Sequence, residues 1–248
     1  MPQGQRILSY VWKETLMPSE LTDPPLDYLI FHPQRTQYQA SGTARIDDRL
    51  EAWTGPVWTD RISPRGSSNE DPFIWTASWL YSYCHATQLR RVFRKGPFVR
   101  EGSRLFFCSA SDAKDGMLKV DTVFEVARCV RWQPAGTVPA EFLQLGEESI
   151  EWMRHFRHGT SQPDTERAHT GSFTYVAQMG GASFLPMNTK GHAFSVCAAT
   201  VVPEKVEKII AANPSGRNSY PVMLTTSEAE ALLTELQRAP VRVTSINP

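Results

Sequence analysis

The sequence predicts a single-domain α+β protein that is rich in β-structure. Its 248 residues can bury a core without disulfides or metals, and 41% hydrophobic and 21% charged residues are ordinary globular values. Short runs of β-formers bounded by turn residues recur along the chain, and capped amphipathic segments are fewer. Because no low-complexity linker or internal repeat divides the chain, we expect one domain over residues 1–248.

Strands are expected where short runs of branched and aromatic residues are bounded by turns. The expected strands are residues 6–12, 26–31, 104–109, 118–132, 173–177, 183–187 and 193–202. Of these, 104–109 and 118–132 form the clearest hairpin, since the turn residues 111–116 lie between them. Residues 32–49 are polar with few apolar anchors, and we expect a long surface loop there.

Helices are expected at 147–158, at 204–212 and at about 227–238. The last begins with Ser227 and Glu230, which have capping-box spacing. The secondary structure of residues 53–85 is ambiguous. Large side chains at every second position from Phe73 to Tyr83 indicate a strand or irregular structure, whereas Asp71-Pro72 would also suit a helix start.

The charge balance and the cysteines limit the function classes. Lys+Arg and Asp+Glu are 26 each, which disfavours non-specific coating of duplex DNA but not a pocket that reads one small group. The four cysteines form no CxxC pair, which disfavours a zinc or disulfide framework, and Cys108 and Cys129 are expected to be core residues. No apolar run has signal-peptide or membrane-spanning length, so we expect a cytoplasmic protein without membrane contact.

No catalytic motif of high specificity is present. The chain has no G-x-S-x-G elbow and no Walker A loop, and Gly180-Gly181 is expected to form a hairpin turn. His155 and His158 could share a helix face and hold a metal, but favourable placement at a helix C-terminus is the plainer interpretation. Adjacent Cys84 and His85 would point to opposite faces of a strand, which disfavours a dyad. We expect no metal and no cofactor.

Tryptophan is concentrated in the first third of the chain, among arginines and polar loop residues. Flat side chains beside guanidinium groups suit stacking on a base and reading its edge. Core packing is the competing interpretation, because alternating aromatic residues on a strand usually line a core. The predicted ligand-binding residues are Trp12, Trp53, Trp58, Arg61, Arg65, Trp75 and Trp79.

The segment 99–109, followed by a polar turn and by residues 119–126, resembles the PUA-like superfamily. The likeness is to its ASCH and EVE-type members and to nucleotide-modification-associated domains, and residues 7–12 resemble the opening strand of such domains. Ser103 stands where that pattern usually has Asp. The resemblance implies a β-barrel-like core with flanking helices, and a cleft that receives a flipped, often modified, base. No catalytic residue is carried over by it.

The leading hypothesis is therefore a module that binds nucleic acid or a nucleotide and recognises a base, which could be modified, through an aromatic cleft. One alternative is an enzyme that processes nucleotides or nucleic acid, with His32, His85, Asp71 and Arg65 as its candidates. Another is an interaction or defence component whose tryptophans form an oligomer interface. The ligand, the strand order and the oligomeric state stay open.

Overall fold

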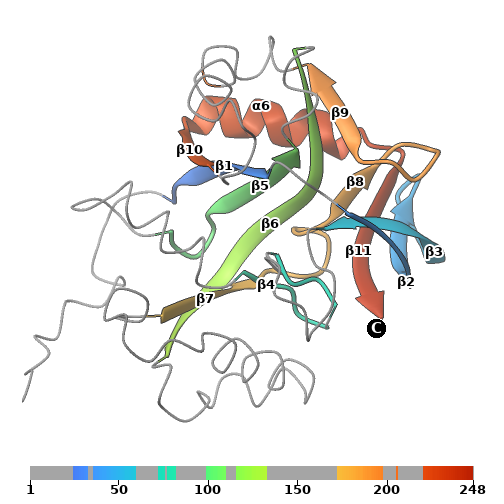
Figure 1. The fold of residues 1–248 in the computed structure, drawn as a ribbon, viewed down its shortest axis with the longest axis horizontal. Helices are drawn as coiled ribbons and strands as arrows, with labels where there is room; N and C mark the ends of the chain where they lie inside the picture. The colour runs from blue at the N-terminus through green and yellow to red at the C-terminus, as the bar shows by residue number, and fades with distance from the viewer. Residues whose placement is uncertain are drawn as a thin grey trace, which may run out of the picture.

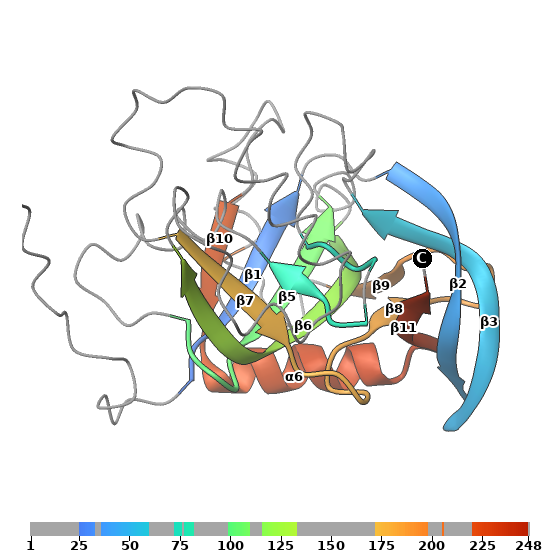
Figure 2. The same cartoon turned by 90° about the horizontal axis from the view of Figure 1, so that it is seen from below.

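The computed structural model describes residues 25–32, 36–59, 72–75, 77–81, 99–109, 116–132, 172–197, 205 and 220–247. Within these ranges strands dominate, arranged in two sheets, and one helix, α6 (Thr226–Gln237), lies across a sheet face (Figures 1 and 2). No helix among the described residues has both the length and the apolar character needed to cross a bilayer.

The central sheet has seven strands. Along it lie β10 (Tyr220–Leu224), β1 (Asp27–His32), β5 (Arg104–Ser109), β6 (Met117–Trp132), β7 (Ser172–Ala177) and β4 (Leu80–Tyr81), and β9 (Phe194–Cys197) also pairs with β6. β1 and β5 are parallel, and the other pairs are antiparallel. The 16-residue strand β6 pairs with β5 along one edge and with β9 and then β7 along the other.

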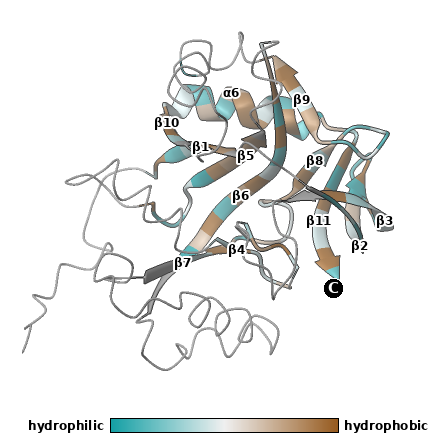
Figure 3. Cartoon of the chain, viewed as in Figure 1, coloured by the Kyte–Doolittle hydropathy of each residue, from teal (hydrophilic) through white to brown (hydrophobic). Residues whose placement is uncertain are grey.

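Both faces of the central strands are buried. One face packs on α6 and the other on a second core, so successive residues of β1 and β5 enter different cores. This explains why both strands are nearly continuous apolar runs between their ends, as the brown stretch of β5 in Figure 3 shows. The face toward α6 includes Leu29, Phe31, Phe106, Cys108 and Val123, which pack with Leu232 and Leu236 of the helix. The opposite face includes Tyr28, Ile30, Leu105, Phe107, Phe124 and Val126.

The second sheet has the order β3 (Arg49–Thr59), β2 (Thr36–Ile46), β11 (Val241–Asn247) and β8 (Leu185–Met187). β2 and β3 form a long hairpin whose turn residues, Asp47 and Asp48, have φ of 47° and 61°. Positive φ at both turn residues matches the twist of the flanking strands. The expected surface loop over 32–49 is therefore wrong for its described part.

The two sheets are joined by residues 184–187, which contact β6 at one end and β11 along β8. Phe184 exchanges backbone hydrogen bonds with Val123 of β6, and β8, which follows at once, pairs with β11. Gly180 and Gly181 do form a turn, with φ of 83° and 105°, but it leads from one sheet toward the other rather than closing a hairpin.

The expected β-barrel-like core with flanking helices is wrong. The described strands form two open sheets, with β10 and β4 at the ends of one and β3 and β8 at the ends of the other. The parallel pairing of β1 with β5 puts the apolar strands in a sheet that needs cover on both faces, and α6 and the second sheet provide that cover. The result is layered rather than closed.

Most expected strands are confirmed, with shifted ends. Residues 26–31, 104–109, 118–132 and 173–177 correspond to β1, β5, β6 and β7, and the segments 183–187 and 193–202 contain β8 and β9. The predicted hairpin of β5 and β6 is confirmed, and Cys108 is buried. β10 and β11 were not predicted. The strand at 6–12 and the helix at 147–158 lie outside the described residues, as does the helix at 204–212 apart from Lys205.

The region 53–85 is mixed. Its first part belongs to β3, and the described residues between 72 and 81 are irregular apart from the short β4 and a bridge of Phe73 with Leu80. The expectation of strand or irregular structure is confirmed for the described part of the region, where no helix occurs.

Candidate functional site

Three partly buried aromatic residues lie at the margin of the core between the two sheets. They are Tyr38 of β2, Trp53 of β3 and Trp75, and we call them the aromatic rim. Each packs against fully buried core residues and keeps part of its surface exposed. Packing has already restricted such an aromatic side chain, so it loses little further conformational entropy when a flat ligand binds.

Tyr38 and Trp75 meet edge to face. Their ring centroids are 5.7 Å apart and the rings are inclined at 85°. Such a pair is favourable beyond its buried area, because the positive edge of one ring meets the negative face of the other. Tyr38 is paired in register with the fully buried Val57, so the strand itself fixes the base of this pair.

Trp53 lies along its own strand over Gly55. A Cβ at Gly55 would come within 2.8 Å of the Trp53 indole, so the indole occupies the space that a side chain would need. A glycine weakens a strand because it has no side chain to pack, and an aromatic neighbour that covers the glycine restores packing. Trp53 is thereby held over Gly55 on the hairpin, with part of its surface accessible.

The other predicted ligand-binding residues are placed differently. Trp79 is fully buried in the core, and its indole N–H has no hydrogen-bond partner among the described residues. Trp58 belongs to β3 opposite Gln37, and nothing is described of its side chain. Trp12, Arg61 and Arg65 lie outside the described residues. Trp53 and Trp75 therefore both pack against the core between the sheets while remaining partly exposed, whereas Trp79 is a fully buried core residue.

The candidates for catalysis are not brought together by the described part of the chain. His32 ends β1 opposite Ser109, and nothing is described of its side chain. His85, Asp71 and Arg65 lie outside the described residues, as do His155, His158 and Cys84. No group of His, Cys, Asp or Glu that could hold a metal ion occurs among the residues whose positions are described.

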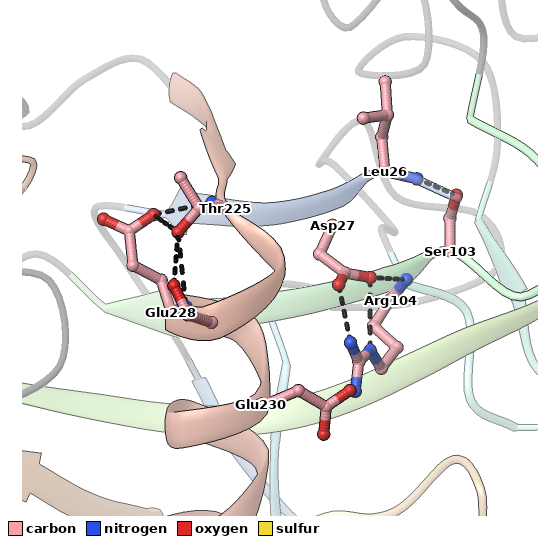
Figure 4. A network of polar contacts seen from close by, with 8 residues as sticks. Leu26, Asp27, Ser103, Arg104, Thr225, Glu228 and Glu230 are labelled. Atoms are coloured by element: carbon pink, nitrogen blue, oxygen red, sulfur yellow. Dashed lines mark hydrogen bonds and ion pairs between the residues drawn. The ribbon is translucent and has the colours of Figure 1, made fainter. Parts of the chain in front are cut away.

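A row of charged residues crosses three neighbouring strands and was missed by the sequence analysis. Asp27 of β1, Arg104 of β5 and Glu125 of β6 are neighbours in register, and Glu230 of α6 reaches the same guanidinium (Figure 4). The Arg104 backbone N–H donates to Asp27 Oδ1 at 2.8 Å and its Nη2 donates to Oδ2 at 2.7 Å. Arg104 Nη1 lies 2.8 Å from Glu230 Oε1.

The charges in this row affect one another and their neighbours. Burial raises the pKa of Glu125, and the nearby Arg104 only partly offsets this. Burial opposes the charge on Arg104, but hydrogen bonds to Asp27 and Glu230 outweigh it and raise the Arg104 pKa. Burial, with the charge of Asp27, raises the pKa of Tyr28 to about 12. The row is well suited to holding the sheet and helix together, and it presents no exposed nucleophile.

Ser103 has a structural position beside this row. Its hydroxyl is fully buried and accepts hydrogen bonds from the backbone N–H groups of Leu26 and Arg100, each at 3.1 Å. Ser103 therefore ties the turn before β5 to the start of β1, as Figure 4 shows for Leu26. A small hydroxyl that serves two backbone donors explains the residue at this position without a ligand.

The helix beside the row is capped by Thr225. Its side chain accepts from the Glu228 backbone N–H, and the Glu228 carboxylate accepts from the Thr225 backbone N–H at 2.6 Å. Lys205 also pairs with Glu228. Burial would raise the Glu228 pKa, but the hydrogen bonds from Lys205 and Thr225 outweigh it and lower that pKa. The expected cap at Ser227 with Glu230 is thus wrong by two residues, and Glu230 is free to meet Arg104.

Comparison with known proteins does not assign this chain to a family. No protein-family model, no curated protein and no solved structure matches this chain. Nothing in these comparisons bears on the PUA-like resemblance of residues 99–132. The geometry of the described residues therefore carries the functional argument.

Proposed function

We propose that this chain is a module that binds nucleic acid or a nucleotide and recognises a base by stacking it on the aromatic rim. The observation that carries the proposal is that Trp53 and Trp75 both pack against the core between the sheets and stay partly exposed, while Trp79 is completely buried. Two of the predicted stacking residues thus keep the accessible surface that stacking requires.

The balanced charge favours a small ligand group over a long stretch of phosphate backbone. With 26 basic and 26 acidic residues, the chain has no overall excess to neutralise many phosphates. Stacking needs no such excess, because every base has a π-face that an indole can cover. A single base, presented by a nucleotide or by a flipped or single-stranded position, is therefore compatible with the balanced charge. A flipped base is also the ligand that the PUA-like resemblance implies. A cytoplasmic location is part of the same proposal.

The test is a tryptophan-fluorescence titration of the full chain with nucleotides and short oligonucleotides that carry normal and modified bases. We expect saturable quenching for one base type. Stacking on a base contributes about 1–3 kcal/mol, so Trp53→Ala and Trp75→Ala should each weaken binding by roughly 5- to 150-fold. Trp53→Phe, which keeps a flat ring over Gly55, should retain most of the affinity.

The control is Met223→Ala, because Met223 is a large hydrophobic residue with accessible surface that belongs to β10 rather than to the aromatic rim. Circular dichroism should show that each variant keeps its strand content. Unchanged affinity in a folded Trp53→Ala/Trp75→Ala double variant would rule out the rim. Binding lost only in Trp53→Ala/Trp58→Ala would move the site to the far end of β3.

A further inference from the structure

Among the described strands, β3 is an end strand of the second sheet. In the described part of the chain its one strand partner is β2, and residues 49–52 and Thr54 are exposed. In an antiparallel hairpin, alternate residues turn their backbone groups away from the partner strand. With a two-residue turn, Ile46 and Arg49 form the first bonded pair, so Leu50 and Ala52 direct their N–H and C=O groups outward.

The edge is rigidly held at its start. Arg242 Nη2 donates to Asp48 Oδ1 at 2.6 Å, and Arg45 Nη1 donates to the Asp48 carbonyl at 3.1 Å. Both arginines belong to strands of the same sheet, so the turn is fastened to the sheet. A preformed edge loses little conformational entropy when another strand pairs with it. Pro56, which lacks an N–H, limits such pairing to the part of β3 that precedes it.

Exposed residues at this edge have a self-complementary order. Arg49 and Glu51 have opposite charges and flank Leu50, whose side chain is 61% exposed. Within the described residues, neither charged side chain makes an ion pair or hydrogen bond. Charges on an edge strand ordinarily prevent pairing. Here an antiparallel copy would place each charge opposite its counter-charge.

We propose that β3 pairs with β3 of a second copy of this chain, antiparallel about a two-fold axis centred on Leu50. In that register Leu50 lies opposite its own copy and exchanges both backbone hydrogen bonds with it. Arg49 of each copy then faces Glu51 of the other in a closely spaced, non-hydrogen-bonded pair. Leu50 of each copy packs on its counterpart on the opposite face.

The position of the hairpin suits this partner. β2 and β3 form one end of the molecule in Figure 2, so two hairpins can overlap near their turns while the rest of each chain extends away. Since the overlap is short, the dimer is a weak and reversible one. The interface is isologous, and each surface contributes the same residues.

Charge exchange in the full chain tests the proposal. Sedimentation equilibrium over a range of concentrations should show a reversible dimer. Arg49→Glu and Glu51→Arg should each raise its dissociation constant roughly tenfold or more, because two symmetric attractive pairs become repulsive. A mixture of the two variants should form a heterodimer, and Arg49→Glu/Glu51→Arg should restore the wild-type value.

Lys190→Glu is the control, because Lys190 is exposed in the turn between β8 and β9 and the substitution changes net charge as Arg49→Glu does. It should leave the dimer unchanged. A chain that stays monomeric at every concentration would overturn the proposal. So would a double variant as weak as either single one, since that result would assign the edge to another partner.

Discussion

Arg104 donates to Asp27 from its backbone N–H and from two guanidinium nitrogens, at 2.8, 3.2 and 2.7 Å. The two residues stand at the starts of the parallel strands β5 and β1 and are 77 positions apart. Because the same guanidinium also reaches Glu230, one side chain joins two strands to the helix that covers them.

Removing the carboxylate should strongly destabilise the fold. Asp27→Asn leaves a largely buried guanidinium with only an exposed partner, since the side chains of Arg104 and Asp27 are 12% and 7% exposed. Breaking such a pair costs about 3 kcal/mol. Glu230→Gln should cost no more than about 1 kcal/mol, because Glu230 is 60% exposed. Urea unfolding measures both, and equal losses would contradict the account.

The helix cap gives a sharp comparison between neighbouring positions. Thr225→Ala should lower the free energy of unfolding by about 1 kcal/mol, because the Glu228 N–H loses its acceptor. Ser227→Ala, at the position with the sequence-predicted capping spacing, should change it much less. Thermal unfolding followed by circular dichroism distinguishes them. A larger loss at Ser227 would place the start of the helix two residues later.

Gly42 is required by a close approach of two strands. A Cβ there would lie 2.0 Å from the Ser245 carbonyl oxygen, where the extra residue Thr244 bulges β11 beside β2. Gly42→Ala should cost about 3 kcal/mol, since backbone has to move. Gly116→Ala, with open space but a φ of +70°, should cost about 1 kcal/mol. Similar losses in chemical denaturation would show that the bulge yields easily.

Glu125 should make stability depend on pH. Its folded-state pKa is raised, mainly by burial, so the stabilisation from its protonated form is present below the ordinary pKa. That contribution is lost as the pH rises through the raised pKa. Glu125→Gln should therefore be more stable than wild type near pH 7, with the difference shrinking toward about pH 4. A difference that stays constant over this range would contradict the shift.

The sequence predicted the central strands well because burial on two faces gives them short runs rich in apolar residues. β1, β5 and β6 stand out on composition alone, and so does the turn before β6. The hairpin of β2 and β3 does not stand out in the sequence, because the inner face of β2 carries the small residues Ala40, Gly42 and Ala44 and its outer face is polar. Small residues suit the close approach of β11 but give no hydrophobic alternation.

The layered architecture depended on contacts between distant segments. The ion pair of Asp27 with Arg104, and the bulge of β11 beside Gly42, join residues 77 and about 200 positions apart, which local patterns do not reveal. A charged residue at the start of an apolar run was the available signal for the pair. For the site, composition identified the tryptophans, but only the fold separates the buried Trp79 from the accessible Trp53 and Trp75.

The most direct test of the proposed function is an NMR titration that follows the indole N–H signals of the seven tryptophans. Assignment by single Trp→Phe substitutions would identify each signal. With the base that quenches fluorescence, we predict saturable shifts for Trp53 and Trp75 and an unmoved signal for the buried Trp79. Signals of Trp53 and Trp75 that stay fixed while binding saturates would contradict the claim that the aromatic rim holds the base.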